Sequence, residues 1–405
     1  MNKKLILTIG LIIYLIIAFV TEIFYRNKLY DKSVDYIEKI KQDGFFKFFY
    51  FFWSYIFAFG TMLIGLIITF FCYPLNIFYS HLSIRFFFTF IMSILKSLYS
   101  SPRPYWDIYV KKQEGSPNKF LSDPTECDGE FGNPSGHAIL ATNLLILWDL
   151  FINSNCFKSL NKQQKTLIKY SSLTLSILCI ICIIYSRVHR QVHSFNQILF
   201  GTILGVAGYF TFCQILEINK IEPKIFMENI IKFKFIVIPI FIILFGISLT
   251  LGLTRHNEDE DEYKKILKLY CDIDNEDKMF GRNTALLSTM IFAVIGGYIG
   301  LLFLNYQIKK NYSNNENLFY NWNKGSKLAT LEVTLFTGLL SVIFFIPMIF
   351  INNYVLKIVI WSLIFFCFGF SLFGLAFYYG CVLFKKKEIE KENLFLIYNY
   401  DKDLE

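Results

Sequence analysis

The chain has few histidines and little charge for its length, and its cysteines form no recognisable pattern. Among 405 residues there are five His and nine Cys, and 18% of the residues are charged. Most cysteines lie in or beside apolar stretches, including the pair Cys179 and Cys182, so we expect packed helix residues and no disulfide framework. No Cys/His spacing or carboxylate cluster is typical of a metal site, and no repeat or Pro/Gly/Ser-rich linker divides the chain. These absences argue against a metal cofactor, a repeat protein and a set of linked soluble domains.

Hydrophobic residues are in clear excess. They make up 54% of the chain, the mean hydropathy is +0.44, and they gather in blocks of roughly 20 residues, the length that crosses about 30 Å of hydrocarbon. The net charge of +8 does not indicate nucleic acid, because the lysines are spread over many short connections. We predict an all-α, polytopic transmembrane helical bundle of about ten spans, in which Arg85 snorkels from near a span end. The candidate spans are 5–24, 48–72, 78–99, 135–153, 169–187, 194–217, 232–253, 284–305, 328–351 and 355–384.

The distribution of basic residues orients these spans, because short loops rich in Lys and Arg stay in the cytoplasm. With the N-terminus in the cytoplasm, the basic connections 154–168, 218–231 and 306–327 are cytoplasmic and the acidic loop 254–283 lies outside. The lysine-rich segment 25–47 disagrees, since it would also lie outside. Three loops and the basic tail support this orientation, and we adopt it with the first span as an uncleaved anchor.

Two polar groups then fall on the outer face. Lys96 lies at the outer end of the third span, and Arg103 follows seven residues later, close to two helical turns. Ser135, Gly136 and His137 open the fourth span, where a helix N-terminus presents N–H groups to an anion. Ser135 is placed to cap this helix, but capping leaves His137 unexplained.

A third group, SRVHRQVHSFNQ at 186–197, forms a very short outer connection. It holds Arg187, His189, Arg190 and His193. Cations in a short outer loop run against the positive-inside tendency, so they indicate an anionic ligand. Cations, helix N–H groups and histidines on one face are what phosphoryl transfer requires, and a metal-free mechanism is predicted.

Together these motifs resemble the type-2 phosphatidic acid phosphatase superfamily, which is related to the vanadium haloperoxidases. The family pattern is K-x6-R-P, then P-S-G-H, then S-R-x5-H-x3-D. This chain has KSLYSSPRP at 96–104, PSGH at 134–137 and SRVHRQVH at 186–193. The resemblance covers about residues 45–217 and implies a helical phosphatase core, with an additional membrane-associated core helix around 33–42.

The resemblance also implies a role for each matching residue. His193 would attack phosphorus to form a phosphohistidine, and His137 would protonate the leaving oxygen. Gln197 departs from the family's Asp; it could orient His193 at i, i+4 but would stabilise an imidazolium less than a carboxylate does. The residues implied in phosphate binding are Lys96, Arg103, Ser135, Gly136 and Arg187.

These features imply an integral-membrane phosphatase that hydrolyses phosphomonoesters without a cofactor. The substrate is a lipid phosphate, such as phosphatidate or a sphingoid phosphate, or alternatively a sugar phosphate. The glucose-6-phosphatases resemble this chain in Gln197, in RPYW at 103–106 and in CDGEFGNPSGHA at 127–138. A third hypothesis is a non-catalytic membrane transporter or binding protein with a degenerate core. The expected partners are the substrate and the lipid bilayer, without nucleic acid, and the oligomeric state stays open.

Four regions are expected. They are an N-terminal anchor helix with an amphipathic loop (1–44), the phosphatase-like membrane core (45–217), additional transmembrane helices (218–384) and a cytoplasmic tail (385–405). The active site is expected on the lumenal or extracellular face, in the endoplasmic reticulum or another endomembrane rather than the plasma membrane.

Overall fold

In the part of the chain that the computed structural model describes, every regular element is a helix, which confirms the all-α prediction. The described residues are 3–40, 44–73, 75–113, 127–154, 157, 159–219, 223–254, 258–311, 353–376 and 378. In chain order the elements are α1 (Lys3–Ile37), α2 (Gly44–Phe51), η1 (Phe52–Phe57), α3 (Ala58–Cys72), α4 (Leu75–Tyr99), α5 (Pro104–Gln113), α6 (Gly136–Ala141), α7 (Asn143–Ile152), α8 (Lys162–His189), α9 (Phe195–Asn219), α10 (Pro223–Thr254), α11 (Glu260–Cys271), η3 (Glu276–Lys278), α12 (Phe280–Ser288), α13 (Ile291–Asn311), α15 (Tyr354–Phe370) and η5 (Ser371–Ala376).

The described helices account for nine of the predicted spans. Seven are long and apolar enough to cross a membrane, and two shorter apolar helices lie at Leu63–Cys72 and Gly136–Ile152. The remaining predicted span, 328–351, lies outside the described residues. The chain is therefore a multi-pass membrane protein.

The first helix is longer than its apolar stretch. α1 has 35 residues, so at about 1.5 Å per residue it is roughly 50 Å long and extends past the hydrocarbon. Its last turns pack against the rest of the protein, where Val34 and Ile37 are buried. The prediction of a separate core helix at 33–42 is wrong, because residues 33–37 continue α1.

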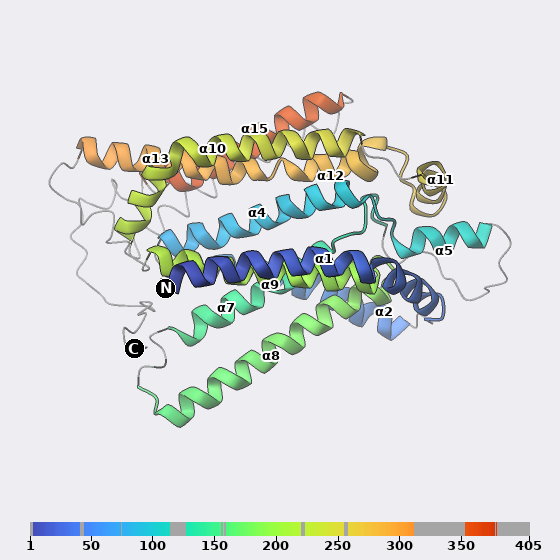
Figure 1. Cartoon of the computed structure of the whole chain (residues 1–405), viewed down its shortest axis with the longest axis horizontal. Coiled ribbons are helices and arrows are strands. Elements are labelled where there is room, and N and C mark those ends of the chain that lie inside the picture. Colours follow the sequence, from blue (N-terminus) through green and yellow to red (C-terminus); the bar gives the residue numbers. More distant parts are fainter. Residues whose placement is uncertain are drawn as a thin grey trace.

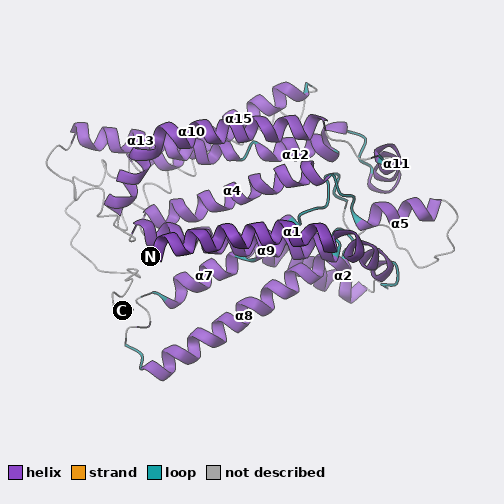
Figure 2. Cartoon of the chain, in the orientation of Figure 1, coloured by secondary structure: helices purple, strands orange, loops and turns teal. Residues whose placement is uncertain are grey.

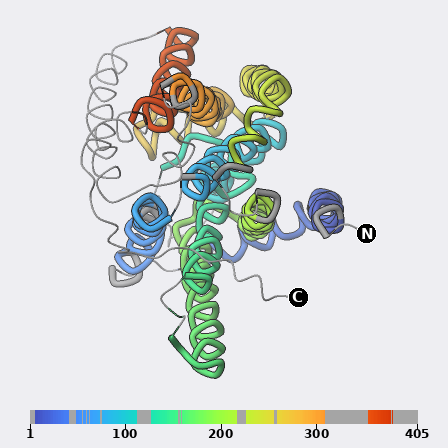
Figure 3. The backbone as a smooth tube through the Cα atoms, turned by 90° about the vertical axis from the view of Figure 1, so that its left-hand side faces the viewer, coloured from blue at the N-terminus to red at the C-terminus, as the bar shows by residue number. Residues whose placement is uncertain are grey.

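Helix α4 lies at the centre of the bundle. Figure 1 shows it between α1 and α9 on one side and α10, α13 and α15 on the other, and Figure 3 gives the view turned by 90°. Helices α9, α10, α12 and α13 all pack against α4. The helices after residue 220 therefore pack directly on the segment that carries the motifs.

Two glycines of α9 allow α6 to approach closely. A Cβ on Gly201 would lie 2.5 Å from the backbone oxygen of Ser135, and one on Gly205 would lie 2.2 Å from Thr142 Oγ1. Small residues four apart are a common device for close helix packing in membranes. Ser135 is thereby brought against α9, where its N–H donates to the backbone oxygen of Gln197 at 3.0 Å.

Arg85 does not snorkel, contrary to prediction. It lies in the middle of α4, is 8% exposed, and donates from Nε to His81 Nε2 at 3.0 Å. His81 is also 2.6 Å from Asn143 Oδ1 and 3.2 Å from Thr69 Oγ1. Because neighbouring helices surround α4, residue 85 faces protein rather than lipid. We call Thr69, His81, Arg85 and Asn143 the mid-membrane cluster.

Candidate active site

Several connections between the long helices gather at the end of the bundle that carries α5 and α11 (Figure 2). Helix α4 ends there at Tyr99, because Pro102 and Pro104 and the residues before them disfavour further helix. Lys96 lies in the last turn of α4, and Arg103 immediately precedes α5. Their side chains are 1% and 0% exposed. Two fully buried cations require anionic partners.

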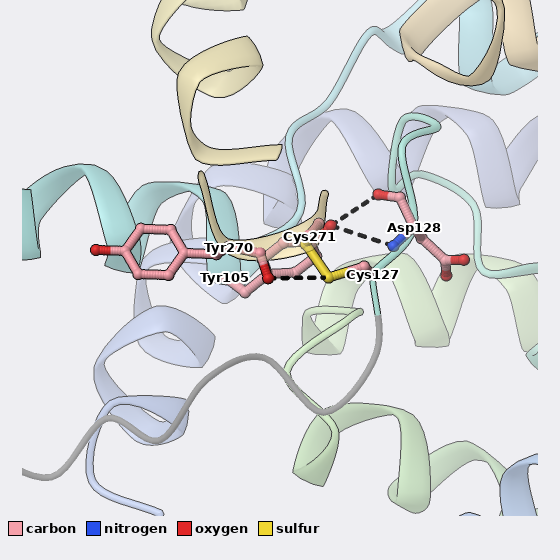
Figure 4. The surroundings of a disulfide bond; sticks show 5 residues. All are labelled: Tyr105, Cys127, Asp128, Tyr270 and Cys271. Carbon is pink, nitrogen blue, oxygen red and sulfur yellow. Dashed lines mark hydrogen bonds between the residues drawn. A yellow bond between two sulfur atoms is a disulfide. The ribbon is translucent and has the colours of Figure 1, made fainter. Parts of the chain in front are cut away.

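A disulfide bond anchors the loop that precedes the PSGH motif. Cys127 is bonded to Cys271, the last residue of α11, across 144 residues of sequence (Figure 4). The prediction that the cysteines form no disulfide is therefore wrong for this pair. Nothing in either cysteine's sequence neighbourhood identifies its partner, and the packing of α11 against α5 brings their Cα atoms to 5.5 Å.

The backbone of this loop is also fixed by hydrogen bonds. The Tyr105 hydroxyl donates to the backbone oxygen of Asp128 at 2.8 Å and accepts from its N–H at 3.2 Å. Phe280 N–H donates to the backbone oxygen of Gly129 at 2.6 Å, and a Cβ on Gly129 would lie 2.2 Å from the backbone oxygen of Lys278. Figure 4 shows the Asp128 carboxylate turned away from the disulfide. The loop is thus held from both α5 and the α11–α12 segment.

Two carboxylates of this loop pair with three buried cations. Glu130 Oε1 forms an ion pair with Lys96 Nζ and lies 3.3 Å from Arg103 Nη2. Asp128 Oδ2 lies 3.0 Å from Arg103 Nη1 and 3.5 Å from Arg187 Nη2. We call Lys96, Arg103 and Arg187 the cation cluster, and Asp128 and Glu130 the loop carboxylates. The structure therefore brings together three of the predicted phosphate-binding residues.

His193 lies beside the cation cluster in an orientation that Gln197 determines. Gln197 Nε2 donates to the backbone oxygen of Pro102 at 2.7 Å, so Oε1 is the atom that accepts from Ser194 N–H at 3.2 Å. The same Oε1 lies 3.2 Å from His193 Nδ1, which must therefore carry the proton. Nε2 is left with its lone pair, 3.4 Å from Arg103 Nη1. This is the tautomer that a nucleophilic histidine needs.

Gly132 makes room for the Gln197 side chain. A Cβ on Gly132 would lie 2.5 Å from Gln197 Nε2 and 2.7 Å from its Oε1. The N–H of Gly132 donates to the backbone oxygen of Ser101 at 2.9 Å, which ties the loop to the segment that carries Arg103. Gly132 is therefore required at this position, because any larger residue would overlap the Gln197 amide.

The electrostatics of the site keep its histidine neutral and its aspartate charged. Burial lowers the pKa of His193 well below its usual value, and the charges of Arg103, Arg187 and Lys96 lower it further. Burial by itself would raise the pKa of Asp128, but the same cations outweigh it and lower that pKa to about 2. A neutral imidazole and a charged carboxylate thus coexist at physiological pH.

The PSGH residues lie next to this cluster. His137, the second residue of α6, interacts electrostatically with Arg187, Asp128 and Lys96. Ser135 occupies the N-cap position of α6, but the prediction that its side chain caps the helix is wrong, because that side chain makes no capping hydrogen bond. Its Oγ is buried and finds no hydrogen-bond partner among the described residues. Gly136 lies beside Met92, whose Sδ would be 2.6 Å from an added Cβ.

His189 and Arg190 lie apart from the cluster, although they share the short loop. The His189 ring stacks on Tyr50 with centroids 4.2 Å apart and meets Tyr185 edge-on. Arg190 lies over the ring of Phe51, 5.6 Å from its centroid. Both residues therefore attach α8 to the segment around α2.

Sequence reasoning missed the two loop carboxylates, Gly132 and a third carboxylate, Glu22. Glu22 of α1 is fully buried, ion-paired with Arg26, and accepts from Asn133 Nδ2 at 2.9 Å. The sequence offered one signal for the loop carboxylates: Asp128 and Glu130 lie two residues apart, shortly before the PSGH motif. Acidic residues in an outer loop look like a solvated surface, however, so only their contacts reveal their position.

Comparison with known proteins gives one match. Residues 76–220 match the model of the PAP2 superfamily, whereas no curated protein and no solved structure gives a significant match. The matched segment contains every predicted site residue, from Lys96 to Gln197, and it ends before Cys271 and the rest of α11. Residues 76–220 are thus similar to the PAP2 superfamily, which supports the resemblance to the type-2 phosphatidic acid phosphatases.

Proposed function

We propose that the protein is an integral-membrane phosphatase that hydrolyses phosphomonoesters through a phosphohistidine intermediate. The similarity of residues 76–220 to the PAP2 superfamily indicates action on phosphate esters. The observation that carries the proposal is the orientation of His193, whose Nε2 lone pair faces Arg103 while Gln197 binds the other ring nitrogen. A buried neutral imidazole beside cations is suited to attack an anionic phosphoryl group.

In the first step, His193 Nε2 attacks phosphorus. The P–N bond forms as the bond to the leaving oxygen breaks, and His137 donates a proton to that oxygen. The cation cluster and Ser135 Oγ would stabilise the charge on the three remaining oxygens. Because Gln197 Oε1 accepts a hydrogen bond from Nδ1–H, the developing positive charge on His193 is stabilised by an amide dipole rather than a carboxylate.

In the second step, water attacks the phosphohistidine. His137, now neutral, takes a proton from the water as the P–N bond breaks, and inorganic phosphate and neutral His193 are released. The three cations supply charge stabilisation that many phosphoryl-transfer sites obtain from metal ions. We therefore propose a metal-independent reaction.

A lipid phosphate is the first candidate substrate, and a sugar phosphate is the alternative. The RPYW motif, which resembles glucose-6-phosphatases, does not favour the alternative, because Tyr105 and Trp106 are 0% exposed. Trp106 packs against Tyr263 and Phe280, so its role is to join α5 to the α11–α12 segment. Gln197 is the shared feature that keeps the sugar phosphate as an alternative.

The site is proposed to face the lumen of an endomembrane or the cell exterior. The Cys127–Cys271 disulfide supports this, because such bonds persist in oxidising compartments and are rare in the cytosol. The bond lies at the same end of the bundle as the cation cluster, since Asp128 follows Cys127 directly. The distribution of basic residues gives the same orientation independently.

The test is phosphate release by the purified full chain. Phosphatidate, a sphingoid phosphate and glucose 6-phosphate are compared as substrates, with and without orthovanadate, for wild type, His193→Ala and His189→Ala. Wild type and His189→Ala should release phosphate from one substrate class, and His193→Ala should release none. A radiolabelled phosphoryl group should be trapped on wild type as an acid-labile adduct.

Two outcomes would contradict the proposal. Equal release by wild type and His193→Ala would exclude His193 as the nucleophile. Absence of release from every substrate by folded wild type would favour the non-catalytic hypothesis, a transporter or binding protein. The substrate that is hydrolysed decides between lipid and sugar phosphate.

A further inference from the structure

We propose that Asp128 and Glu130 weaken the binding of oxyanions, because they occupy the positions that substrate oxygens would take and are displaced when phosphate binds. This inference rests on the proposed function in one respect, that the cation cluster is the phosphate site. The loop carboxylates would then set how tightly the site holds any oxyanion, including the product.

The first support is the bridging pattern of the carboxylate oxygens. One oxygen of Glu130 contacts both Lys96 and Arg103, and one oxygen of Asp128 contacts both Arg103 and Arg187. A phosphoryl group bound by three cations would present its oxygens in the same bridging positions. Phosphate and loop carboxylates therefore compete for the same donors.

The second support is the charge of the site. Three cations and two carboxylates leave a net charge of one positive unit when both histidines are neutral, and of two when His137 carries the proton that it donates. A phosphomonoester carries about −1.5 to −2 at neutral pH, so binding it beside both carboxylates would cancel most or all of this positive charge. Displacing the carboxylates restores a positive environment around the phosphate.

The third support is the way the two sets of side chains are held. The cations are at most 1% exposed, whereas the side chains of Glu130 and Asp128 are 16% and 32% exposed and cover them. Arg103 also donates from Nε to the backbone oxygen of Glu130 at 2.7 Å and from Nη1 to that of Val192 at 3.0 Å. It therefore keeps its position when the carboxylates leave.

The loop backbone is fixed, so the carboxylates leave by side-chain rotation. The Cys127–Cys271 bond, the two hydrogen bonds of Asp128 with Tyr105 and the bond from Phe280 to Gly129 hold the main chain. Glu130 Oε2 is buried and finds no hydrogen-bond partner among the described residues. An unsatisfied carboxylate oxygen lowers the cost of moving that side chain.

The low pKa of Asp128 makes this competition constant across physiological pH. The carboxyl group stays charged, because its pKa is lowered to about 2 by the neighbouring cations despite its burial. The buried cations remain paired before phosphate binds, and the affinity for product phosphate is kept low. The loop carboxylates thus favour turnover over tight retention of phosphate.

The first experiment measures the binding of inorganic phosphate to the purified full chain by calorimetry. Asp128→Asn and Glu130→Gln keep the shape of each side chain and remove its charge. Each should bind phosphate about tenfold more tightly than wild type, because a neutral amide no longer competes for two cations. Asp261→Asn is the matched control, since Asp261 is an exposed α11 residue whose side chain is 94% accessible.

The control should bind phosphate within about twofold of wild type, because exposed charges are screened. Unchanged or weaker binding by both Asp128→Asn and Glu130→Gln, with melting temperatures equal to wild type, would overturn the proposal. Tighter binding by Asp261→Asn to the same extent would also overturn it, because general electrostatics would then explain the gain.

A second experiment uses the wild-type chain and does not depend on variants that fold. A carbodiimide with an amine nucleophile labels accessible carboxyl groups, and mass spectrometry reports labelling of the peptide that carries Asp128 and Glu130. Adding orthovanadate should increase that labelling several-fold, because displaced carboxylates become exposed. Protection by orthovanadate would overturn displacement.

The two proposals fail in distinguishable ways. A chain that binds phosphate more tightly after Asp128→Asn but hydrolyses no ester would contradict the proposed function and retain this inference. A chain that hydrolyses esters through His193 but whose phosphate affinity is insensitive to both substitutions would retain the function and overturn the inference.

Discussion

The cation cluster and the mid-membrane cluster are two buried polar groups that both include residues of α4. Lys96 and Arg85 both belong to α4, eleven residues apart, which is about 16 Å along the helix axis. In both, an arginine contacts a histidine, Arg103 with His193 and Arg85 with His81. Buried ionisable residues are rare inside membrane proteins and by default suggest function. Their partners differ, however, and so do their expected roles.

Beside the cation cluster, Arg103 Nη1 also lies 3.4 Å from His193 Nε2, but each side chain has further anchors. His193 is oriented by Gln197, Arg103 is held by backbone carbonyls, and the cations pair with loop carboxylates that reach solvent. In the mid-membrane cluster, Arg85 donates a hydrogen bond directly to His81, so the lone pair of His81 Nε2 is engaged in a structural contact. A buried arginine beside a histidine is thus insufficient for a phosphoryl-transfer site. The further anchors of Arg103 and the longer contact to His193 Nε2, 3.4 Å against 3.0 Å for Arg85 and His81, are what distinguish the two pairs.

The largest expected effect compares the two arginines. Arg103→Ala should reduce kcat/KM by about 10³-fold or more, because charge stabilisation in the transition state is lost. Arg85→Ala should lower the melting temperature but leave kcat/KM of the folded fraction close to wild type. Phosphate-release kinetics and thermal unfolding of both variants provide the measurement. A catalytic loss in Arg85→Ala at unchanged stability would show that the mid-membrane cluster acts in the reaction.

The next effect concerns the disulfide, which supports only the cation cluster. Cys271→Ser should lower the free energy of unfolding by about 2–4 kcal/mol, as expected for loss of a long-range disulfide. Denaturant unfolding measures this, and Cys367→Ser, an exposed free cysteine, is the control. Equal stability of Cys271→Ser and wild type would mean that the tether is dispensable for the loop.

A smaller effect is expected from Gln197→Asp. A carboxylate beside His193 would favour the imidazolium and raise its pKa, which burial and the cations otherwise hold well below its usual value. Because attack requires neutral imidazole, the acid limb of kcat/KM should move to higher pH. The maximal rate should fall by about tenfold as the bond to the Pro102 carbonyl is lost.

The pH profile of Gln197→Asn separates charge from length, since Asn is as short as Asp but neutral. The acid limb of its kcat/KM profile should stay at the same pH as in wild type. An equal displacement of the limb in both variants would contradict an electrostatic cause.

The smallest effect is expected at His189. His189→Phe keeps an aromatic ring against Tyr50 and Tyr185, so kcat/KM should change by less than about twofold. The same kinetic assay measures it. A large loss without a change in melting temperature would place His189 in the reaction and weaken the distinction between the loop's histidines.

Much of the architecture was predictable from local patterns. Hydropathy located nine described spans, and the motif spacing placed Lys96, Arg103, Arg187 and His193 at one end of the bundle. The prediction from hydropathy failed for Arg85, because hydropathy does not say which neighbours surround a helix. It failed for the end of α1 too, since that helix continues past its apolar stretch through contacts such as Ser33 Oγ accepting from Phe195 N–H at 2.8 Å.

Residue types and their order along the chain were sufficient for the helical membrane fold and the chemistry of the motifs, because both depend on local composition and short spacings. The loop carboxylates, the disulfide partner of Cys127 and the direction of the Gln197 amide depend on the folded chain. Lys96 and Glu130 are 34 residues apart, and Cys127 and Cys271 are 144 apart. Which groups meet across such separations is decided by helix packing, since many residues of the same type are equally distant along the chain.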